Sequence, residues 1–363
     1  MIRPEQKPRS EVYFVPASAA EAADTISRKV ERLYEALGIE SHIRKDSFVA
    51  LKIHFGEKDN TGFISPAWLS GLCGRLIRKT RRAFFTDTNT LYVGNRSNSV
   101  EHLKLAAEHG FSLAASGIPV WIADGLIGRD DEEVKVAFPR LTSVKIASAF
   151  LSSDVLLCLS HFTGHMLTGV GAALKNLGMG CASRAGKLEQ HSDVHPWVKS
   201  SKCTLCRTCF EYCPADAIEE RSGAASILDE RCIGCGECLV VCPAGAISLS
   251  WDDDKGRIQE KMTEYACGVH RLFGERAGYM NFLIKMTRDC DCMSKNDPSF
   301  MEDVGILASR DPVALDRASI DLVGERAGRD IMRELRPIDW SIQLEHARKI
   351  KFGNLDYELV NLT

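Results

Sequence analysis

Two cysteine motifs with the same spacing stand in the middle of this 363-residue chain. The first, CTLCRTCFEYCP, begins at Cys203, and the second, CIGCGECLVVCP, begins at Cys232. Each motif has three cysteines separated by two residues, followed after three more residues by a Cys-Pro pair. Eight thiols at such spacing restrict the intervening chain to short loops that wrap metal centres, so this segment dictates its own local fold.

The spacing predicts two [4Fe-4S] clusters, because two-residue gaps let three thiolates surround a cuboidal cluster and the distal cysteine reaches the other one. Cluster one is predicted to take Cys203, Cys206, Cys209 and Cys242, and cluster two to take Cys232, Cys235, Cys238 and Cys213. A pair of four-cysteine zinc sites is the alternative, but structural zinc usually uses C-x2-C pairs separated by a longer loop. Over residues 195–250 the chain resembles the two-cluster bacterial ferredoxin domain.

The composition of the whole chain indicates its cellular compartment and excludes some classes of partner. Fourteen cysteines in a chain without an apolar N-terminal segment predict metal ligands or reactive thiols in a reducing cytoplasm, not a disulfide framework. A net charge of −3 argues against nucleic acid and anionic membrane surfaces as partners. No stretch approaches the ~18 uncharged apolar residues of a membrane span.

Strands and helices alternate on both sides of the cysteine motifs. Strands are predicted at 48–54, 83–88, 119–124, 142–148, 154–161, 279–286 and 303–309, with helices between most of them. This alternation is typical of a mostly parallel sheet with helices on its faces. We therefore expect one discontinuous α/β domain, residues 1–194 and 251–363, interrupted by a small α+β two-cluster domain at 195–250.

Polar residues follow several predicted strands, and ligands of parallel α/β sheets bind beyond the carboxyl ends of strands. The candidates for a catalytic or binding site at these ends are Lys52, His54, Asp87, Asn89, His161, His165, Lys175 and Asn176. Each has a structural alternative, since a single histidine or glycine-rich turn is weak evidence. Together they predict a site for a small anionic or organic ligand.

Cys290-Asp291-Cys292 adds two further candidates. Two thiols one residue apart are not expected to bond easily to each other. Both could meet a further metal, or one could act as a nucleophile, and a buried turn of small residues is the structural alternative.

The motifs KIHFGE, FTDTNTLYVGNR, HFTGHMLTGVGAALKNLGMG, CDC and ILASRDPVALDRAS together resemble the family catalogued as domain of unknown function 362. Members of that family often carry inserted or appended two-cluster ferredoxin modules. The resemblance implies a cytoplasmic iron–sulfur protein of prokaryotic or archaeal type, and it does not imply a particular reaction. The stretch from His161 to Lys175 alone is also similar to lactate racemase-type nickel-cofactor proteins.

Three functions are compatible with these observations. The first is electron transfer by two [4Fe-4S] clusters to or from a redox partner protein or a site in the α/β domain. The second is an oxidoreductase whose substrate or cofactor lies at the strand ends. The third is a protein that binds or assembles a metal or cofactor, which a further metal at Cys290 and Cys292 would favour.

Overall fold

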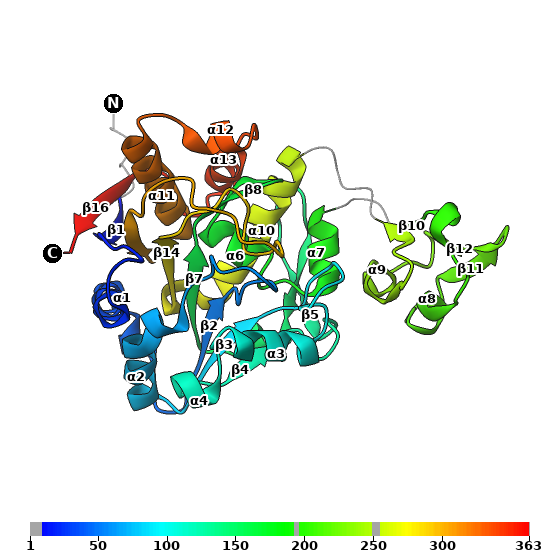
Figure 1. Ribbon diagram of the computed structural model, residues 1–363, viewed down its shortest axis with the longest axis horizontal. Coiled ribbons are helices and arrows are strands. Elements are labelled where there is room, and N and C mark those ends of the chain that lie inside the picture. The colour runs from blue at the N-terminus through cyan, green and yellow to red at the C-terminus, as the bar shows by residue number, and fades with distance from the viewer. Residues whose placement is uncertain (1–8, 192–195, 249–254, 363) are drawn as a thin grey trace.

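The structure is a computed structural model that describes residues 9–191, 196–248 and 255–362. Its centre is an eight-stranded sheet in the order β16-β1-β15-β14-β7-β2-β3-β4, with helices on both faces (Figure 1). The strands are β1 (Ser10–Val15), β2 (Phe48–Ile53), β3 (Arg82–Asp87), β4 (Val120–Ile122), β7 (Val155–His161), β14 (Ala277–Leu283), β15 (Gly305–Ser309) and β16 (Tyr357–Asn361). All run parallel except β15, which is antiparallel to both neighbours, so the predicted α/β class with a mostly parallel sheet is confirmed.

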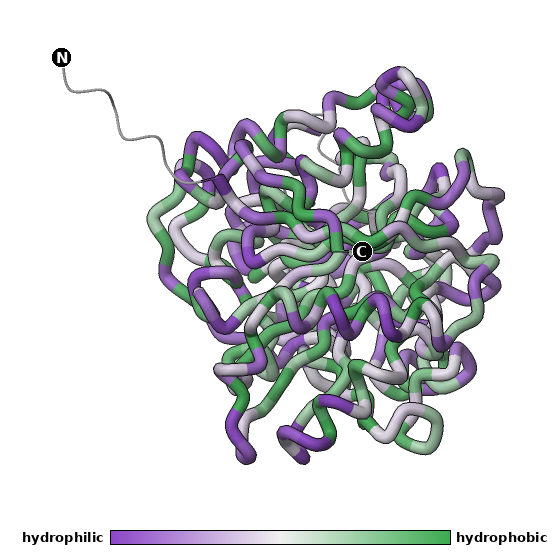
Figure 2. Tube along the Cα trace, turned by 90° about the vertical axis from the view of Figure 1, so that its left-hand side faces the viewer, coloured by the Kyte–Doolittle hydropathy of each residue, from purple (hydrophilic) through white to green (hydrophobic). Residues whose placement is uncertain are grey.

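The central strands are apolar along their whole length because helices cover both faces of the sheet. Successive residues of β7 face opposite sides. Leu156 packs into the core beneath α6 (Ala173–Gly178), α10 (Lys255–Phe273) and α11 (Pro312–Ala327), whereas Leu157 packs into the core beneath α1 (Ala23–Leu37) and α2 (Ser70–Lys79). Many hydrophilic positions lie along the outline of the molecule (Figure 2).

Shorter elements complete the α/β part. They are α3 (Ser99–Glu108), α4 (Leu113–Ser116), α5 (Ser148–Leu151), α7 (Arg184–His191), α12 (Ile331–Leu335), α13 (Ser341–Lys349), the pair β5 (Asp131–Lys135) and β6 (Ser143–Ala147), the pair β8 (Thr163–His165) and β9 (Gly169–Gly171), and 3₁₀ turns at Ile39–His42, Pro66–Leu69 and Gly274–Arg276. The strand predicted at 142–148 is β6, but it pairs with β5 in a separate hairpin instead of joining the main sheet.

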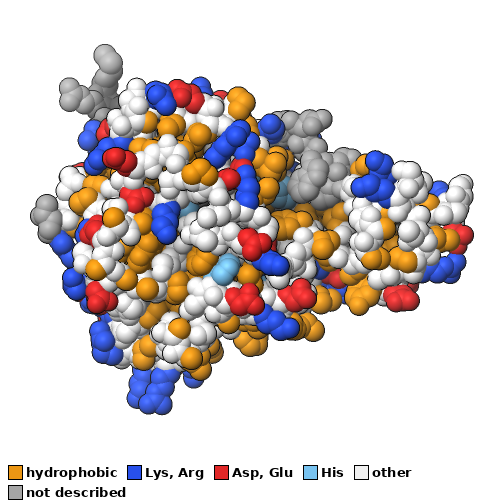
Figure 3. All heavy atoms as spheres, viewed as in Figure 1, with side chains coloured by type: hydrophobic (Ala, Val, Ile, Leu, Met, Phe, Trp, Pro, Cys, Tyr) orange, Lys and Arg blue, Asp and Glu red, His pale blue; other side chains and the backbone are white. Residues whose placement is uncertain are grey.

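Residues 196–248, called here the cysteine-rich segment, form a lobe beside α7 (Figures 1 and 3). The segment contains β10 (Trp197–Val198), a 3₁₀ turn at Ser200–Lys202, α8 (Thr208–Glu211), β11 (Ile218–Arg221), β12 (Ala224–Ile227), α9 (Glu237–Val241) and β13 (Ile247–Ser248). It has a small core of its own around Cys209, Ile218, Ala225, Cys238 and Ile247. Its predicted boundaries at 195 and 250 lie outside the described residues, so the division into domains stays a prediction.

None of the helices in the described ranges is long and apolar enough to cross a membrane.

Candidate functional site

The carboxyl ends of β2, β3, β7 and β14 meet at one edge of the sheet because these strands are parallel. Residues that follow three of them surround a pocket, called here the strand-end pocket. Its lining residues are His54, Ser160, His161, Thr163, Gly171, Ala172, Lys175, Asn176, Cys290, Asp291 and Cys292. Thus six of the predicted site residues share one pocket, and they come from segments more than two hundred residues apart in sequence.

Lys52 and Asp87 lie beneath this pocket as a buried ion pair. The Nζ atom of Lys52 is 3.0 Å from a carboxylate oxygen of Asp87, and the lysine side chain is 1% exposed. Burial acts to raise the pKa of the Asp87 carboxyl, but Lys52 and the other cationic neighbours hold that pKa well below its usual range. The Asp87 carboxyl is therefore ionised. Lys52 also orients Asn176, whose Oδ1 atom accepts a hydrogen bond of 2.5 Å from it.

The Asn176 amide is fully used in holding the floor of the pocket. Its Nδ2 atom donates to the Leu159 carbonyl oxygen at 2.9 Å and to the Ser160 hydroxyl at 3.0 Å. Asn176 therefore positions β7 against α6.

His54 presents a hydrogen-bond donor at the wall of the pocket. Its Nδ1 atom accepts from the Gly56 backbone N–H at 3.0 Å, so the neutral ring carries its proton on Nε2. Burial lowers the pKa of His54 well below 6.5, which keeps the ring neutral. Within the described parts of the chain the buried Nε2 atom has no hydrogen-bond partner.

His161 is cationic because both of its ring nitrogens face acceptors. Nδ1 lies 2.9 Å from the Asp291 carboxylate and Nε2 lies 2.9 Å from the Ile284 carbonyl oxygen, so both nitrogens donate. Burial acts to lower the pKa of His161, but Asp291 outweighs it and the pKa is raised overall.

Cys290 and Cys292 form a disulfide, with their Cα atoms 5.3 Å apart. The expectation that these two thiols do not readily bond to each other was therefore wrong. The chain turns at Asp291 and Cys292, which brings the two Cα atoms within the usual range for a disulfide.

The loop that carries this disulfide is fixed by its neighbours. The Asp291 carbonyl oxygen accepts from the Glu57 backbone N–H at 3.0 Å, and the Cys292 carbonyl oxygen accepts from the Tyr92 hydroxyl at 3.0 Å. Arg96 joins these two contacts, because it pairs with the Glu57 carboxylate at 3.0 Å and donates to Tyr92 at 2.5 Å. Sequence reasoning did not single out Tyr92 or Arg96, although both lie in the quoted motif after β3.

Lys175 lies beside the disulfide. Its Nζ atom lies 3.9 Å from Cys290 Sγ. Burial, together with the charges of Arg96 and Lys52, lowers the pKa of Lys175 to about 8.

Four predicted residues lie outside the lining, namely Lys52 and Asp87, described above, and His165 and Asn89. His165 stands next to the pocket, where one of its ring nitrogens and the two sulfur atoms of the disulfide lie within 4.8 Å of one another. Metals bind cysteine as the thiolate, and two sulfurs joined in a disulfide are not thiolates. A further metal at Cys290 and Cys292 therefore stays a prediction. Asn89 is turned away, since its Nδ2 atom donates to Asp124 at 2.9 Å and to the Gly125 carbonyl oxygen at 2.8 Å.

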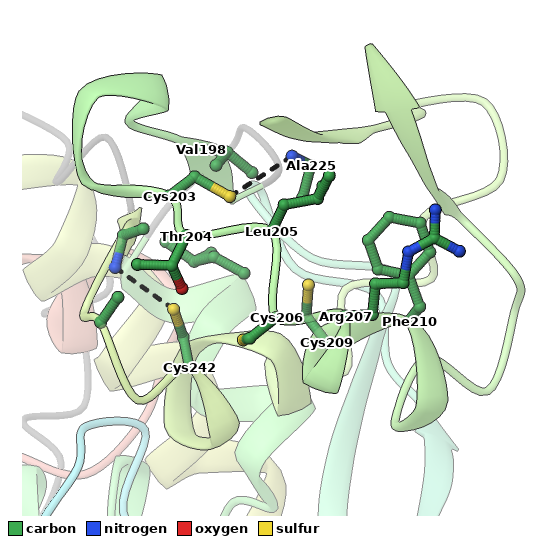
Figure 4. A pocket seen from close by; sticks show the side chains of 13 residues that line it. Val198, Cys203, Thr204, Leu205, Cys206, Arg207, Cys209, Phe210, Ala225 and Cys242 are labelled. Atoms are coloured by element: carbon green, nitrogen blue, oxygen red, sulfur yellow. Dashed lines mark hydrogen bonds between the residues drawn. The ribbon is translucent and has the colours of Figure 1, made fainter. Parts of the chain in front are cut away.

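The eight motif cysteines gather as two sets of four. Cys203, Cys206, Cys209 and Cys242 line one hollow, and their sulfur atoms face a common space (Figure 4). Cys213, Cys232, Cys235 and Cys238 line a second hollow. Each set thus combines three cysteines of one motif with the distal cysteine of the other.

The two motifs also have the same backbone conformation around the second cysteine and the same type of hydrogen bond to the last cysteine. Left-handed residues flank the second cysteine of each motif, Leu205 and Arg207 in the first and Gly234 and Gly236 in the second. The Ala217 backbone N–H donates to Cys213 Sγ at 3.2 Å, and the Ala246 backbone N–H donates to Cys242 Sγ at 3.3 Å.

The second set of cysteines lies next to the α/β part. Glu237, the neighbour of Cys238, forms a buried ion pair with Arg184. Arg184 also donates to the Thr90 carbonyl oxygen at 3.2 Å, and Leu239 packs against the cluster formed by Leu91 and Leu188. The loop after β3 is therefore part of the contact between the two regions.

Comparison with known proteins finds remote structural similarity. The lactate racemase apoprotein from Thermoanaerobacterium thermosaccharolyticum shares 12% identity, with a TM-score of 0.39, 78% of this chain covered and 52% of that protein covered. A protein from Thermotoga maritima solved in a structural genomics programme shares 11% identity, with a TM-score of 0.38 and coverages of 75% and 53%. This chain spans about half the length of each, and because both TM-scores are below 0.5 we draw nothing about function from them.

None of the curated proteins compared with the chain matches it. A family model does match, over a range that holds the strand-end pocket and the cysteine-rich segment together. That range is residues 49–321, well over half of the chain, and the protein therefore belongs to the family described as Domain of unknown function (DUF362).

Proposed function

We propose that this protein is an iron–sulfur electron-transfer protein whose cysteine-rich segment is an inserted two-cluster ferredoxin-type domain. Each set of four cysteines would hold one [4Fe-4S] cluster, which would supply one-electron transfer when bound. The electrons pass between a redox partner protein and the strand-end pocket. The observation that carries this proposal is the crossed grouping of the eight cysteines into two sets of four.

The donor chemistry of each set fits the proposed group. Four thiols converge on one hollow, and backbone N–H groups point at the sulfurs of Cys213 and Cys242. Hydrogen bonds to cluster sulfurs are one of the means by which a protein tunes the reduction potential. A zinc site would need the same thiols, so the choice of metal rests on the repeated two-residue spacing.

The position of the second set favours transfer into the α/β part. Gly236, between Cys235 and Cys238, has φ 74°, and an added Cβ would lie 2.9 Å from a methyl group of Leu91. A residue without a side chain is therefore needed both for the backbone conformation and for the close approach. The loop after β3 therefore approaches the second cysteine set closely at Gly236, which supports this direction of transfer.

A second candidate is an oxidoreductase that binds a small anionic ligand in the strand-end pocket. The buried His54 Nε2–H, which lacks an acceptor among the described residues, and the Lys175 ammonium both favour such a ligand. In that case the cysteine-rich segment exchanges electrons with the ligand, and Lys175 and His54 orient it.

Metal and sulfide analysis of anaerobically purified protein tests the proposal. The expected result is about eight irons and about eight acid-labile sulfides per chain, four of each for every cluster. The variant with Cys290→Ser and Cys292→Ser together should contain the same iron and sulfide. Zinc in place of iron, or an iron content that falls only in this variant, would contradict the proposal.

A further inference from the structure

The Cys290–Cys292 disulfide is a poor structural cross-link. Disulfides stabilise mainly by restricting the unfolded chain, and the effect grows with the length of the loop they close. This bond joins residues with a sequence separation of only 2, so it restricts the unfolded chain little.

The loop is also held in place by contacts that do not depend on the S–S bond. Glu57 and Tyr92 bind the carbonyl oxygens of Asp291 and Cys292, and the Asp291 carboxylate binds His161. The sulfur atoms can therefore change oxidation state while the backbone and the Asp291 side chain stay where they are.

The surroundings of Cys290 favour a thiolate. The Lys175 ammonium lies 3.9 Å from Cys290 Sγ, and a neighbouring cation lowers the pKa of a thiol. The other titratable or charged groups that act on Lys175, or on which it acts, are Lys52, His54, Asp87, Arg96, His165, His191 and Asp291.

Two adjacent residues join the disulfide to the cysteine-rich segment. A methyl group of Leu91 would lie 2.9 Å from a Cβ added at Gly236, and the next residue, Tyr92, donates to the Cys292 carbonyl oxygen. The buried ion pair of Arg184 with Glu237 fixes the same loop through the Thr90 carbonyl oxygen. One short loop therefore touches both the second cysteine set and the disulfide.

We propose that Cys290 and Cys292 form a redox-active disulfide that accepts two electrons from the iron–sulfur centres of the cysteine-rich segment. The inference rests on the proposed function and names the electron acceptor within the strand-end pocket. The S–S bond breaks, the two sulfurs take up one electron each, and Cys292 takes one proton from solvent. Cys290 remains a thiolate beside the Lys175 ammonium. Two one-electron centres match the two electrons that one disulfide requires.

Differential thiol labelling of the loaded protein tests this. The anaerobic protein is reduced with a photoexcited deazaflavin, a one-electron donor that is not a thiol, and the thiols are labelled before peptide mass spectrometry. Cys290 and Cys292 should become labelled in the wild-type chain and in the control Cys73→Ser, whose thiol lies in α2. In Cys235→Ser, which breaks the second cysteine set, labelling should fall at least tenfold.

A second measurement distinguishes a variant that has lost electron transfer to the disulfide from a variant whose disulfide can no longer be reduced. Dithiothreitol should reduce Cys290–Cys292 equally in wild-type and Cys235→Ser protein, because it does not need the cysteine-rich segment. Clusters that are present and reduced while Cys290 and Cys292 stay unlabelled would overturn the inference and leave the proposed function standing. A protein without iron would overturn both.

Proton stoichiometry tests the role of Lys175 as a positioning residue. Between about pH 6.5 and 7.5, reduction of the wild-type disulfide should take up one proton, because Cys290 stays a thiolate. In Lys175→Met it should take up two protons, and the equilibrium constant for reduction at pH 7 should fall at least tenfold, about 30 mV for this couple. The exposed control Lys104→Met should behave as wild type. Two protons in the wild-type chain would overturn this part of the inference.

Discussion

The Arg184 guanidinium and the Glu237 carboxylate form an ion pair in which both side chains are almost fully buried. They belong to different regions, since Arg184 begins α7 of the α/β part and Glu237 begins α9 of the cysteine-rich segment. The same guanidinium donates to the carbonyl oxygens of Thr90 and Ser97. The pair therefore fixes the second cysteine set against the loop after β3.

Removing one partner of this pair should loosen that contact. Glu237→Gln leaves the buried Arg184 charge without this carboxylate, which typically costs about 3–5 kcal/mol, whereas Arg184→Gln leaves Glu237 with the more distant Arg129, at 3.6 Å, and should cost less. Hydrogen exchange of the backbone amides from residue 88 to 98 should become faster in either variant, with iron content unchanged. The double variant should lose less free energy of unfolding than the two single variants lose in total. Strictly additive effects on exchange would show that the two side chains act independently.

Double serine variants test the crossed cysteine sets. Cys213→Ser combined with Cys232→Ser removes two cysteines of the same hollow, so about four irons should remain in the other cluster. Cys203→Ser combined with Cys213→Ser removes one cysteine from each hollow, and both clusters should be lost. Iron and sulfide analysis distinguishes the two variants. The opposite pattern would indicate that each motif binds its own cluster.

The His161–Asp291 pair should stabilise the protein in a pH-dependent way. The pKa of His161 is raised above its ordinary value of about 6.5, so the pair contributes fully below about pH 6.5 and its contribution is lost as pH rises through the raised pKa. Asp291→Asn should therefore cost about 3–5 kcal/mol at pH 6 and clearly less at pH 9. Calorimetric unfolding at both pH values measures this.

The exposed residue Asp24 provides the control, and Asp24→Asn should have little effect at either pH. A cost of Asp291→Asn that is the same at pH 6 and pH 9 would show that His161 is not the titrating partner.

Gly164 tests how closely the disulfide loop packs against β8. A Cβ atom at this position would lie 2.2 Å from the Arg288 carbonyl oxygen, so either β8 or the loop must move. Gly164→Ala should destabilise the protein by about 1–3 kcal/mol, and once reduced, Cys290 should be alkylated faster than in the wild-type chain. Unfolding and alkylation rates measure the two effects.

Gly74 offers a matched control in the helix α2. A Cβ atom there would meet only the end of the flexible Arg78 side chain, at 3.6 Å, so Gly74→Ala should stabilise the helix by up to about 1 kcal/mol. If Gly164→Ala behaves like this control, the loop is not held as closely as the structure indicates.

Short-range patterns in the sequence predicted much of this architecture. The sequence predicted a parallel sheet from the apolar runs of β2, β7 and β14, because strands covered on both faces are apolar over several consecutive residues. It predicted a site at the carboxyl edge of this sheet from the polar residues that follow two of these strands. Four of the six candidates that line the strand-end pocket, His54, His161, Lys175 and Asn176, came from this reasoning, and Cys290 and Cys292 came from the Cys-Asp-Cys pattern. The spacing of the motif cysteines likewise predicted which four would lie together, and the hollows group the same cysteines.

The rest depends on partners far away along the chain, for which no local pattern exists. The antiparallel direction of β15 and the pairing of β6 with β5 are set by which neighbour each strand meets. Asn89 follows a strand in sequence as predicted, yet its side chain donates to Asp124 and does not line the pocket.

The sequence by itself determined that eight cysteines stand at cluster-binding spacing inside an α/β chain, because ligand spacing is a property of a few neighbouring residues. Only the tertiary structure decided what lies around Cys290 and Cys292. Tyr92 and Cys292 are 200 residues apart, and Lys175 and Cys290 are 115 apart. Such contacts arise when separate strands end at one edge of a sheet, and the order of strands in a sheet is set by the packing of the whole chain.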